Sequence, residues 1–270
     1  MALTALQVYA NPQFGEILAT MTIDITFFAL AIPAVLFAGI SKGGFGSGAA
    51  FAATPFLALI LEPAQAVGLM LPLLMLMDIG ALRPYWKKWD WPSCRALILG
   101  AVPGIMLGIA FFRVANADVI RFLIGFVAVA FVAYRGARSI GWLRRGRGAM
   151  SDRAGMLAGA VAGFTSFVSH AGGPPAAIFL LSRSLSKTGF QATTVMVFWA
   201  VNMMKFAPYV ALGIISEQTF IADLYLAPVA LLGVWAGVWF HRMVSEKVFF
   251  LITYLLLLTT GSKLIWDALV

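Results

Sequence analysis

The chain of 270 residues is 61% hydrophobic and 11% charged, whereas soluble domains carry about 25% charged residues. So few charges cannot cover a water-exposed surface, which excludes an ordinary soluble domain. The net charge of +8 lies in short connecting segments and forms no basic face interleaved with aromatic residues, so we expect no nucleic acid as a partner.

Cysteine and histidine are too few to build a metal site or a disulfide. Cys94 is the single cysteine, and His170 and His241 are the two histidines, with no metal-ligand spacing among them. We therefore expect no metal, no other cofactor and no catalytic residue. The pattern G-x-x-x-x-G-K-[ST] is also missing, so transport driven by ATP would need another subunit.

Residues 1–22 form an N-terminal extension without the basic region and the A-x-A site of a cleavable signal peptide, so we expect the first helix to stay attached. After it, seven segments approach the roughly 20 apolar residues that a membrane span needs: 23–40, 64–82, 96–113, 118–137, 189–212, 222–241 and 247–266. Three shorter apolar segments, 46–61, 154–169 and 174–184, each begin or end at a Gly/Pro-rich break and either span or re-enter the membrane.

The chain divides into two related halves, a first membrane repeat at 23–137 and a second at 154–270, joined by an Arg-rich linker at 138–153. Ordered matches connect the halves: Gln65-Ala66 with Gln191-Ala192, Asp78 with Asn202, Pro84-Tyr85 with Pro208-Tyr209, and Gly104, Gly108 and Arg113 with Gly233, Gly237 and Arg242. Because five segments per half is an odd number, the halves enter the membrane in opposite senses. The expected fold is an all-α integral membrane protein, an inverted repeat of two five-segment halves with about 8–10 transmembrane or re-entrant helices.

The distribution of charge predicts which side each connection faces. If the linker is cytoplasmic, most of the 19 lysines and arginines, Lys42 among them, fall on the cytoplasmic side, as the positive-inside bias requires. We therefore expect a cytoplasmic linker and external termini.

Two Gly-rich breaks interrupt apolar helix at corresponding places, SKGGFGSG at 41–48 and SHAGGPP at 169–175. Interrupted segments at matching positions of two repeats indicate a binding site, because a helix that starts there presents free N–H groups and the positive end of its dipole to an anion. Pro174 suits the first turn of such a helix. The alternative is that both breaks are tight hairpin loops or small-residue packing faces.

A polar stripe follows one face of the segment 189–212: Gln191, Thr194, Asn202, Lys205 and Tyr209. Lys205 is the one basic residue that we place deep within a helix, and an intramembrane charge is a functional candidate because it is costly. Alternatively, Lys205 snorkels to the interface or pairs with Asp78 in a structural ion pair.

Two titratable residues are candidates for coupling transport to a proton or another ion. His170 borders the second break and changes protonation near neutral pH. Asp78 is a weaker candidate, because it lies near the cytoplasmic end of its segment. For His170 the alternative is an ordinary hydrogen-bonded loop residue.

The segments GISKGGFGSGAAFAATPFLALI at 39–60 and GFTSFVSHAGGPPAAIFLLSRSLSKTGFQATTV at 163–195, with Pro55, Gln191 and Asn202, carry a resemblance to a known family. From about residue 25 onward the chain resembles the sulfite exporter TauE/SafE family of bacterial membrane transporters. The resemblance implies a multi-pass carrier of the bacterial inner membrane for sulfite, an organosulfonate or a related oxyanion, driven by an ion gradient.

The sequence therefore favours an alternating-access carrier that exports a small sulfur-containing anion, with that anion and membrane lipid as partners and a homo-oligomer as an option. An anion channel is one alternative, since the same donors can line a pore. An intramembrane enzyme is disfavoured, because no two catalytic groups share a recognisable spacing. The expected substrate-binding residues come from both breaks and the stripe: Ser41, Gly43, Gly44, Ser47, Ser169, His170, Gly172, Gly173, Gln191, Asn202 and Lys205.

Overall fold

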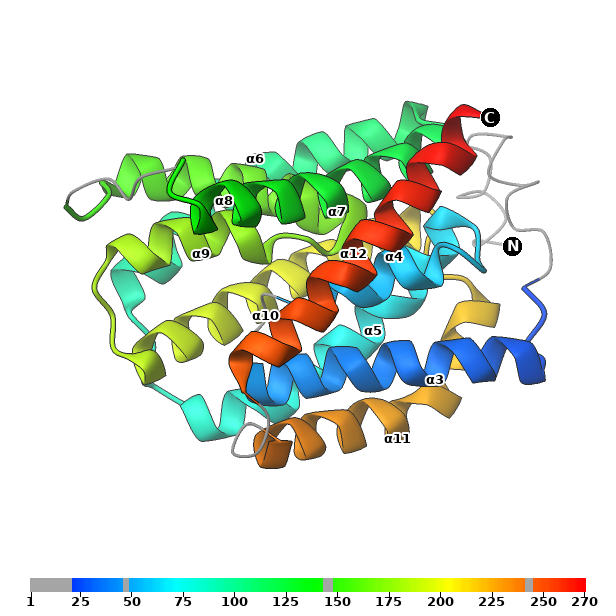
Figure 1. Ribbon diagram of the computed structural model, residues 1–270, viewed down its shortest axis with the longest axis horizontal. Coiled ribbons are helices and arrows are strands. Elements are labelled where there is room, and N and C mark those ends of the chain that lie inside the picture. Colours follow the sequence, from blue (N-terminus) through cyan, green and yellow to red (C-terminus); the bar gives the residue numbers. More distant parts are fainter. Residues whose placement is uncertain (1–20, 46–48, 143–147, 241–244) are drawn as a thin grey trace.

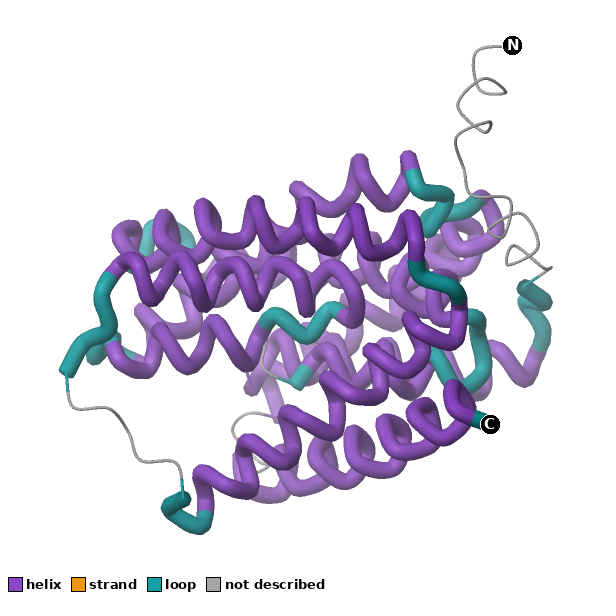
Figure 2. Tube along the Cα trace, turned by 90° about the horizontal axis from the view of Figure 1, so that it is seen from above, coloured by secondary structure: helices purple, strands orange, loops and turns teal. Residues whose placement is uncertain are grey.

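The computed structural model describes residues 21–45, 49–142, 148–240 and 245–270. These residues form helices joined by short connections, and no strand occurs among them (Figure 2). The predicted all-α fold is confirmed over this part of the chain.

Seven of the described helices are long and apolar enough to cross a membrane. They are α3 Ile25–Ile40, α5 Pro63–Leu82, α6 Trp91–Val114, α7 Ala117–Ser139, α10 Lys187–Ala211, α11 Glu217–Phe240 and α12 Glu246–Leu269. Each of the seven segments predicted as a strong span is confirmed as one of these helices. In the case of α3, the span includes residues of the π-helix that follows it.

Capping side chains set where these helices begin. A carboxylate oxygen of Asp24 accepts the N–H of Phe27 at 2.7 Å, and one of Asp90 accepts the N–H of Ser93 at 3.0 Å. Each cap satisfies one of the N–H groups that a helix start leaves without a partner. The same arrangement begins four other helices, at Asn116, Ser151, Ser186 and Ser245.

The outward faces of the long helices are apolar. Leu107 on α6 is 63% exposed, and Leu224 and Trp235 on α11 are 61% and 72% exposed. A surface of this kind is unfavourable in water and suits contact with lipid. Together with the seven spans, it makes the chain a multi-pass membrane protein.

Shorter elements lie at the two predicted breaks. At the first break, α3 is followed by the π-helix η2 Ser41–Phe45, the 3₁₀ helix η3 Ala50–Ala52 and α4 Ala53–Leu57. Away from the breaks, the 3₁₀ helix η4 Arg83–Tyr85 extends α5. In the second half, α8 Asp152–Ser169 precedes α9 Gly173–Ser182. At 1.5 Å per residue α9 is about 15 Å long, half of the roughly 30 Å of a bilayer core, so it is too short to span.

Three helix pairs frame the molecule: α3 with α11, α6 with α8, and α7 with α12. Figure 1 shows α3 beside α11 on one side and α6 beside α8 on the other, with α5 and α10 between them.

Glycines bring these helices close. A Cβ on Gly104 of α6 would lie 2.0 Å from the carbonyl oxygen of Ala160 on α8, and one on Gly237 of α11 would lie 2.4 Å from that of Ile40 on α3. In both pairs, the fourth segment of one half therefore packs on the first segment of the other half. An inverted repeat requires this equivalence, and the repeat itself stays a prediction.

Candidate functional site

The second predicted break lies between α8 and α9. His170 follows the last residue of α8 in the left-handed conformation, with φ of 57°, which is uncommon for a residue other than glycine. The turn stays hydrogen-bonded, because the N–H groups of His170 and Ala171 donate to the carbonyl oxygens of Ser166 and Thr165. The helix restarts at Gly173, so the predicted interruption is confirmed.

The start of α9 presents fewer backbone donors than an ordinary helix start. Pro174 and Pro175 have no N–H, which leaves those of Gly172 and Gly173 in the first turn. Both glycines are buried, and a Cβ on Gly172 would lie 2.7 Å from the carbonyl oxygen of Ala162 on α8. Anion binding by these two N–H groups stays a prediction.

The first break begins inside a continuous helix. α3 passes directly into the π-helix η2, a winding that is frequent at functional sites. Gly43 and Gly44 lie against α11, where a Cβ on each would be 2.1 Å and 2.3 Å from a backbone carbonyl oxygen. The position of these glycines agrees with the alternative interpretation, a small-residue packing face.

Lys42 of η2 forms a buried ion pair with Asp78 of α5. Its ammonium group donates to one carboxylate oxygen of Asp78 and, at 3.2 Å, to the carbonyl oxygen of Leu74. The other oxygen of Asp78 accepts an amide N–H of Asn202 on α10 at 2.7 Å. Lys42, Asp78 and Asn202 are 4%, 0% and 3% exposed, so this network is shielded from both lipid and water.

Lys205, on α10, forms a second buried network with the end of α8. Its ammonium group donates to the carbonyl oxygen and the hydroxyl of Ser166, both at 3.0 Å, and lies 2.9 Å from Nδ1 of His170. The other ring nitrogen, Nε2, lies 2.9 Å from the carbonyl oxygen of Val67 on α5. Because an ammonium group only donates and a carbonyl only accepts, these contacts assign a neutral His170 with its proton on Nε2.

The two networks meet on α10, where Asn202 and Lys205 are three residues apart and share one face of the helix. They connect both breaks, since Lys42 comes from the first and His170 from the second. The networks contain two lysines, Lys42 and Lys205, and one aspartate, Asp78, so with all three ionised they carry an excess of one positive charge. Ammonium, amide and hydroxyl donors in such a place suit an oxyanion.

This geometry corrects two expectations about charge. Lys42, which we grouped with the cytoplasmic loop charges, is buried, so Lys205 is not the one basic side chain deep in the protein. Asp78 pairs with Lys42 and not with Lys205, which is contrary to the alternative of a structural Lys205–Asp78 pair. The Gly- and Ser-rich sequence around Lys42 resembles that of a loop, so the burial of this lysine was not predicted. The signal that could have found it is its correspondence with His170 in the other break.

The remaining predicted residues lie around or away from these networks. Ser41 is buried in η2, and the hydroxyl of Ser169 donates to the carbonyl oxygen of Thr165 at 3.1 Å. Gln191 is half-buried and lies about three turns before Asn202, roughly 16 Å along α10, so it is not brought into the cluster. Ser47 lies outside the described residues.

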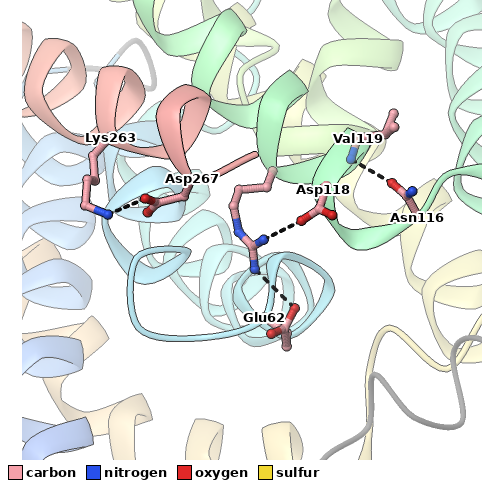
Figure 3. Close-up of polar contacts among 7 residues, drawn as sticks. Glu62, Asn116, Asp118, Val119, Lys263 and Asp267 are labelled. Carbon is pink, nitrogen blue, oxygen red and sulfur yellow. Dashed lines mark hydrogen bonds and ion pairs between the residues drawn. The ribbon is translucent and has the colours of Figure 1, made fainter. Parts of the chain in front are cut away.

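A cavity of about 570 Å³ lies at the end of the molecule where α3 and α5 begin. Its lining includes Arg121 of α7 and the carboxylates of Glu62 and Asp267. Arg121 bonds Asp118 at 2.7 Å and lies 3.4 Å from Glu62. Figure 3 shows these acidic side chains and the neighbouring pair of Lys263 with Asp267.

The same cavity touches α5, the helix that also contacts His170. Gln65 lines the cavity, and Val67, two residues further along the helix, carries the carbonyl oxygen that contacts His170. Gln65 and Val67 are therefore about 3 Å apart along the axis of α5 but point to different sides of the helix.

The family model described as Sulfite exporter TauE/SafE matches residues 31–264, a range that contains both breaks and both networks. The chain belongs to this family. The resemblance seen in the sequence is thereby confirmed, and membership in the TauE/SafE family implies a transporter of sulfite or another small anion. No curated protein and no solved structure matches the chain.

Proposed function

We propose that the chain is a secondary transporter of the bacterial inner membrane that exports a small sulfur-containing anion, such as sulfite or an organosulfonate, by alternating access coupled to an ion gradient. The observation that carries this proposal is the burial of two lysines, Lys42 and Lys205, with one aspartate, Asp78, between the two helix breaks.

An oxyanion would complete this buried arrangement chemically. The oxygens of a sulfite or sulfonate group accept hydrogen bonds, and the two networks hold ammonium, amide and hydroxyl donors close together. A bound monoanion would offset the excess charge, and the interaction would be stronger in the protein interior than in water because the dielectric constant there is lower. Without an anion, the excess ammonium group is costly to keep inside the membrane.

The burial of the networks favours a carrier over an open channel. Lys42, His170 and Lys205 are at most 7% exposed, so a solute reaches them only when helices move apart. The pairs α3–α11 and α6–α8 pack through glycine contacts and would move as units. The cavity beside Gln65 would then be the access path on the side that the charge distribution predicts to be external.

The proposal is tested with the full chain in liposomes. Uptake of labelled sulfite, thiosulfate, taurine, sulfoacetate and a carboxylate control is measured with and without imposed ion gradients. We expect saturable uptake of at least one sulfur anion and exchange of labelled for unlabelled substrate. Large currents that do not saturate would show that the protein is a channel, and chemical conversion of a lipid or peptide would show that it is an enzyme. The absence of flux for every anion would overturn the proposal.

In that assay, we expect Lys205→Met to lower saturable uptake about ten- to a hundredfold, because hydrogen bonds from a charged donor contribute about 1.5–3 kcal/mol. The matched control is Lys187→Met, which removes an exposed ammonium group at the start of the same helix, α10, and should leave uptake unchanged. Membrane levels of both variants are measured alongside. Wild-type uptake by Lys205→Met at normal levels would remove Lys205 from the site.

A further inference from the structure

Asp223, on α11, is a buried carboxyl group without a partner in the part of the chain that the structure describes. The residue is 4% exposed, and neither of its carboxyl oxygens takes part in a hydrogen bond there. Asp78, which is also buried in a spanning helix, differs because both of its oxygens are engaged, by Lys42 and by Asn202. The network described above therefore makes no use of Asp223.

The elements packed against α11 provide no counter-charge for Asp223. α11 packs mainly on α3, α5 and η2. Within its bounds α3 has no ionisable side chain, and those that α5 and η2 contribute are paired with each other. Tyr225, the next ionisable residue on α11, is 63% exposed. The titratable groups on these elements and at their outer ends are Lys42, Asp78, Asp24, Glu62 and Glu217.

An ionised carboxylate at this position would lose its hydration without gaining a partner. The effective cost of burying such an ion is several kcal/mol, whereas a protonated carboxyl group is neutral and costs much less. Intramembrane carboxyl groups are therefore candidates for proton relays by default. Burial and the absence of a described partner together indicate that Asp223 carries a proton in this conformation.

We propose that Asp223 binds the proton that couples anion movement to a proton gradient, an inference that rests on the proposed function. The carboxylate would take the proton from water when the α3–α11 pair separates from α5 on one side, hold it while buried, and release it to water on the other side. His170 and Asp78, the coupling residues predicted from the sequence, already have both ring nitrogens and both oxygens engaged. Asp223 can take a proton without displacing any described bond.

A metal cation is a poorer occupant than a proton. Hard cations need several oxygen ligands, and no three residues among His, Cys, Asp and Glu lie together as a ligand group in the described ranges. A sodium gradient is nonetheless one arm of the test.

The test compares wild type with Asp223→Asn, which keeps the shape of the side chain but cannot be ionised. The substrate is an alkanesulfonate, whose own charge is constant near neutral pH. We expect Asp223→Asn to retain exchange of labelled for unlabelled substrate, while accumulation driven by a pH gradient falls to the level without a gradient. The matched control is Asp152→Asn, the same change at an exposed carboxylate at the start of α8, which should keep full accumulation.

Asp223→Cys provides a second variant in case the asparagine disturbs folding. The two halves match at Gly104 and Gly233. If the same offset is extended toward the N-terminus, Asp223 of the second half corresponds to Cys94 of the first half, which is buried in α6. A cysteine is therefore the side chain that the first half of the chain already holds at the corresponding position, and we expect the same loss of gradient-driven accumulation.

Full pH-driven accumulation by either variant would overturn the proton role, as would a wild type that responds to a sodium gradient and not to a pH gradient. A separate readout needs no transport. The infrared difference spectrum of wild type minus Asp223→Asn in lipid should contain the carbonyl stretch of a protonated carboxyl group. If the wild type moves no anion, the proposed function fails, and this band alone decides whether Asp223 holds a proton.

Discussion

Lys42 and Asp78 bring opposite charges together between η2 and α5, with side chains that are 5% and 0% exposed. The attraction between them is opposed by the loss of their hydration, so the pair contributes little net stability compared with apolar residues of similar size. Removing one partner has a much larger effect, because an uncompensated charge then stays buried, at a cost of about 3–5 kcal/mol. At this scale, stability depends on the two residues jointly.

We expect Asp78→Asn and Lys42→Met each to lower the midpoint of thermal unfolding in detergent, and the double variant to lie closer to wild type than the sum of the two shifts. The double variant holds no unpaired charge, and the amide that Asp78→Asn introduces can still bond Asn202. Strictly additive shifts would contradict a direct pair. Asp267→Asn, which breaks a partly exposed pair with Lys263, serves as control and should shift the midpoint little.

At the scale of the elements, backbone contacts at glycines determine how closely α6 approaches α8. A Cβ on Gly104 would lie 2.0 Å from the carbonyl oxygen of Ala160 and 2.8 Å from the backbone nitrogen of Phe164. Both of these are main-chain atoms, so a change of rotamer cannot relieve the overlap and the helices must move apart. Packing between membrane helices depends on such close contacts, because lipid provides no hydrophobic force between them.

Gly104→Ala should therefore destabilise the protein by about 1–3 kcal/mol, measured as a lower unfolding midpoint in detergent. Gly136→Ala is the matched control, because Gly136 lies in α7 with no atom within 4 Å of the position of its Cβ. There alanine should be neutral or stabilising by up to about 1 kcal/mol, since glycine is a poor helix former. Equal effects of the two substitutions would show that the contact with α8 is unimportant.

At the scale of the whole molecule, α3 begins and α12 ends at the same end of the helix bundle (Figure 1). Met21 and Asp267, which lie just before α3 and near the end of α12, line the same cavity. We predict from the positive-inside bias that the linker is cytoplasmic, and in that orientation this end, and the cavity with it, would be outside.

Reporter fusions test that orientation. A reporter that is active only outside the cytoplasm should be active when fused after Val270, and a reporter that is active only in the cytoplasm should be active when inserted in the linker 138–153. The reverse pattern at both sites would invert the predicted topology. It would also place the cavity beside Gln65 on the cytoplasmic side.

The sequence by itself determined the helical class, the seven spans, the interruption before Gly173 and the family. The first three follow from runs of apolar residues long enough for a bilayer and from Gly and Pro positions that break a helix. The family follows from the resemblance of the segments 39–60 and 163–195 to a known one. The sequence also allowed three candidate site residues to be chosen, Lys205, Asn202 and His170. A polar residue within or beside an apolar segment can be recognised from that segment alone.

Only the tertiary structure decided which polar groups are partners. Asp78 pairs with Lys42 from a different segment, and Ser166 and the carbonyl oxygen of Val67 face Lys205 and His170 through the crossing of separate helices. The isolation of Asp223 is likewise a property of the packing and not of its neighbours in sequence. Periodicity within one helix indicates which residues share a face, but the residues that meet that face are set by packing between helices distant in the chain.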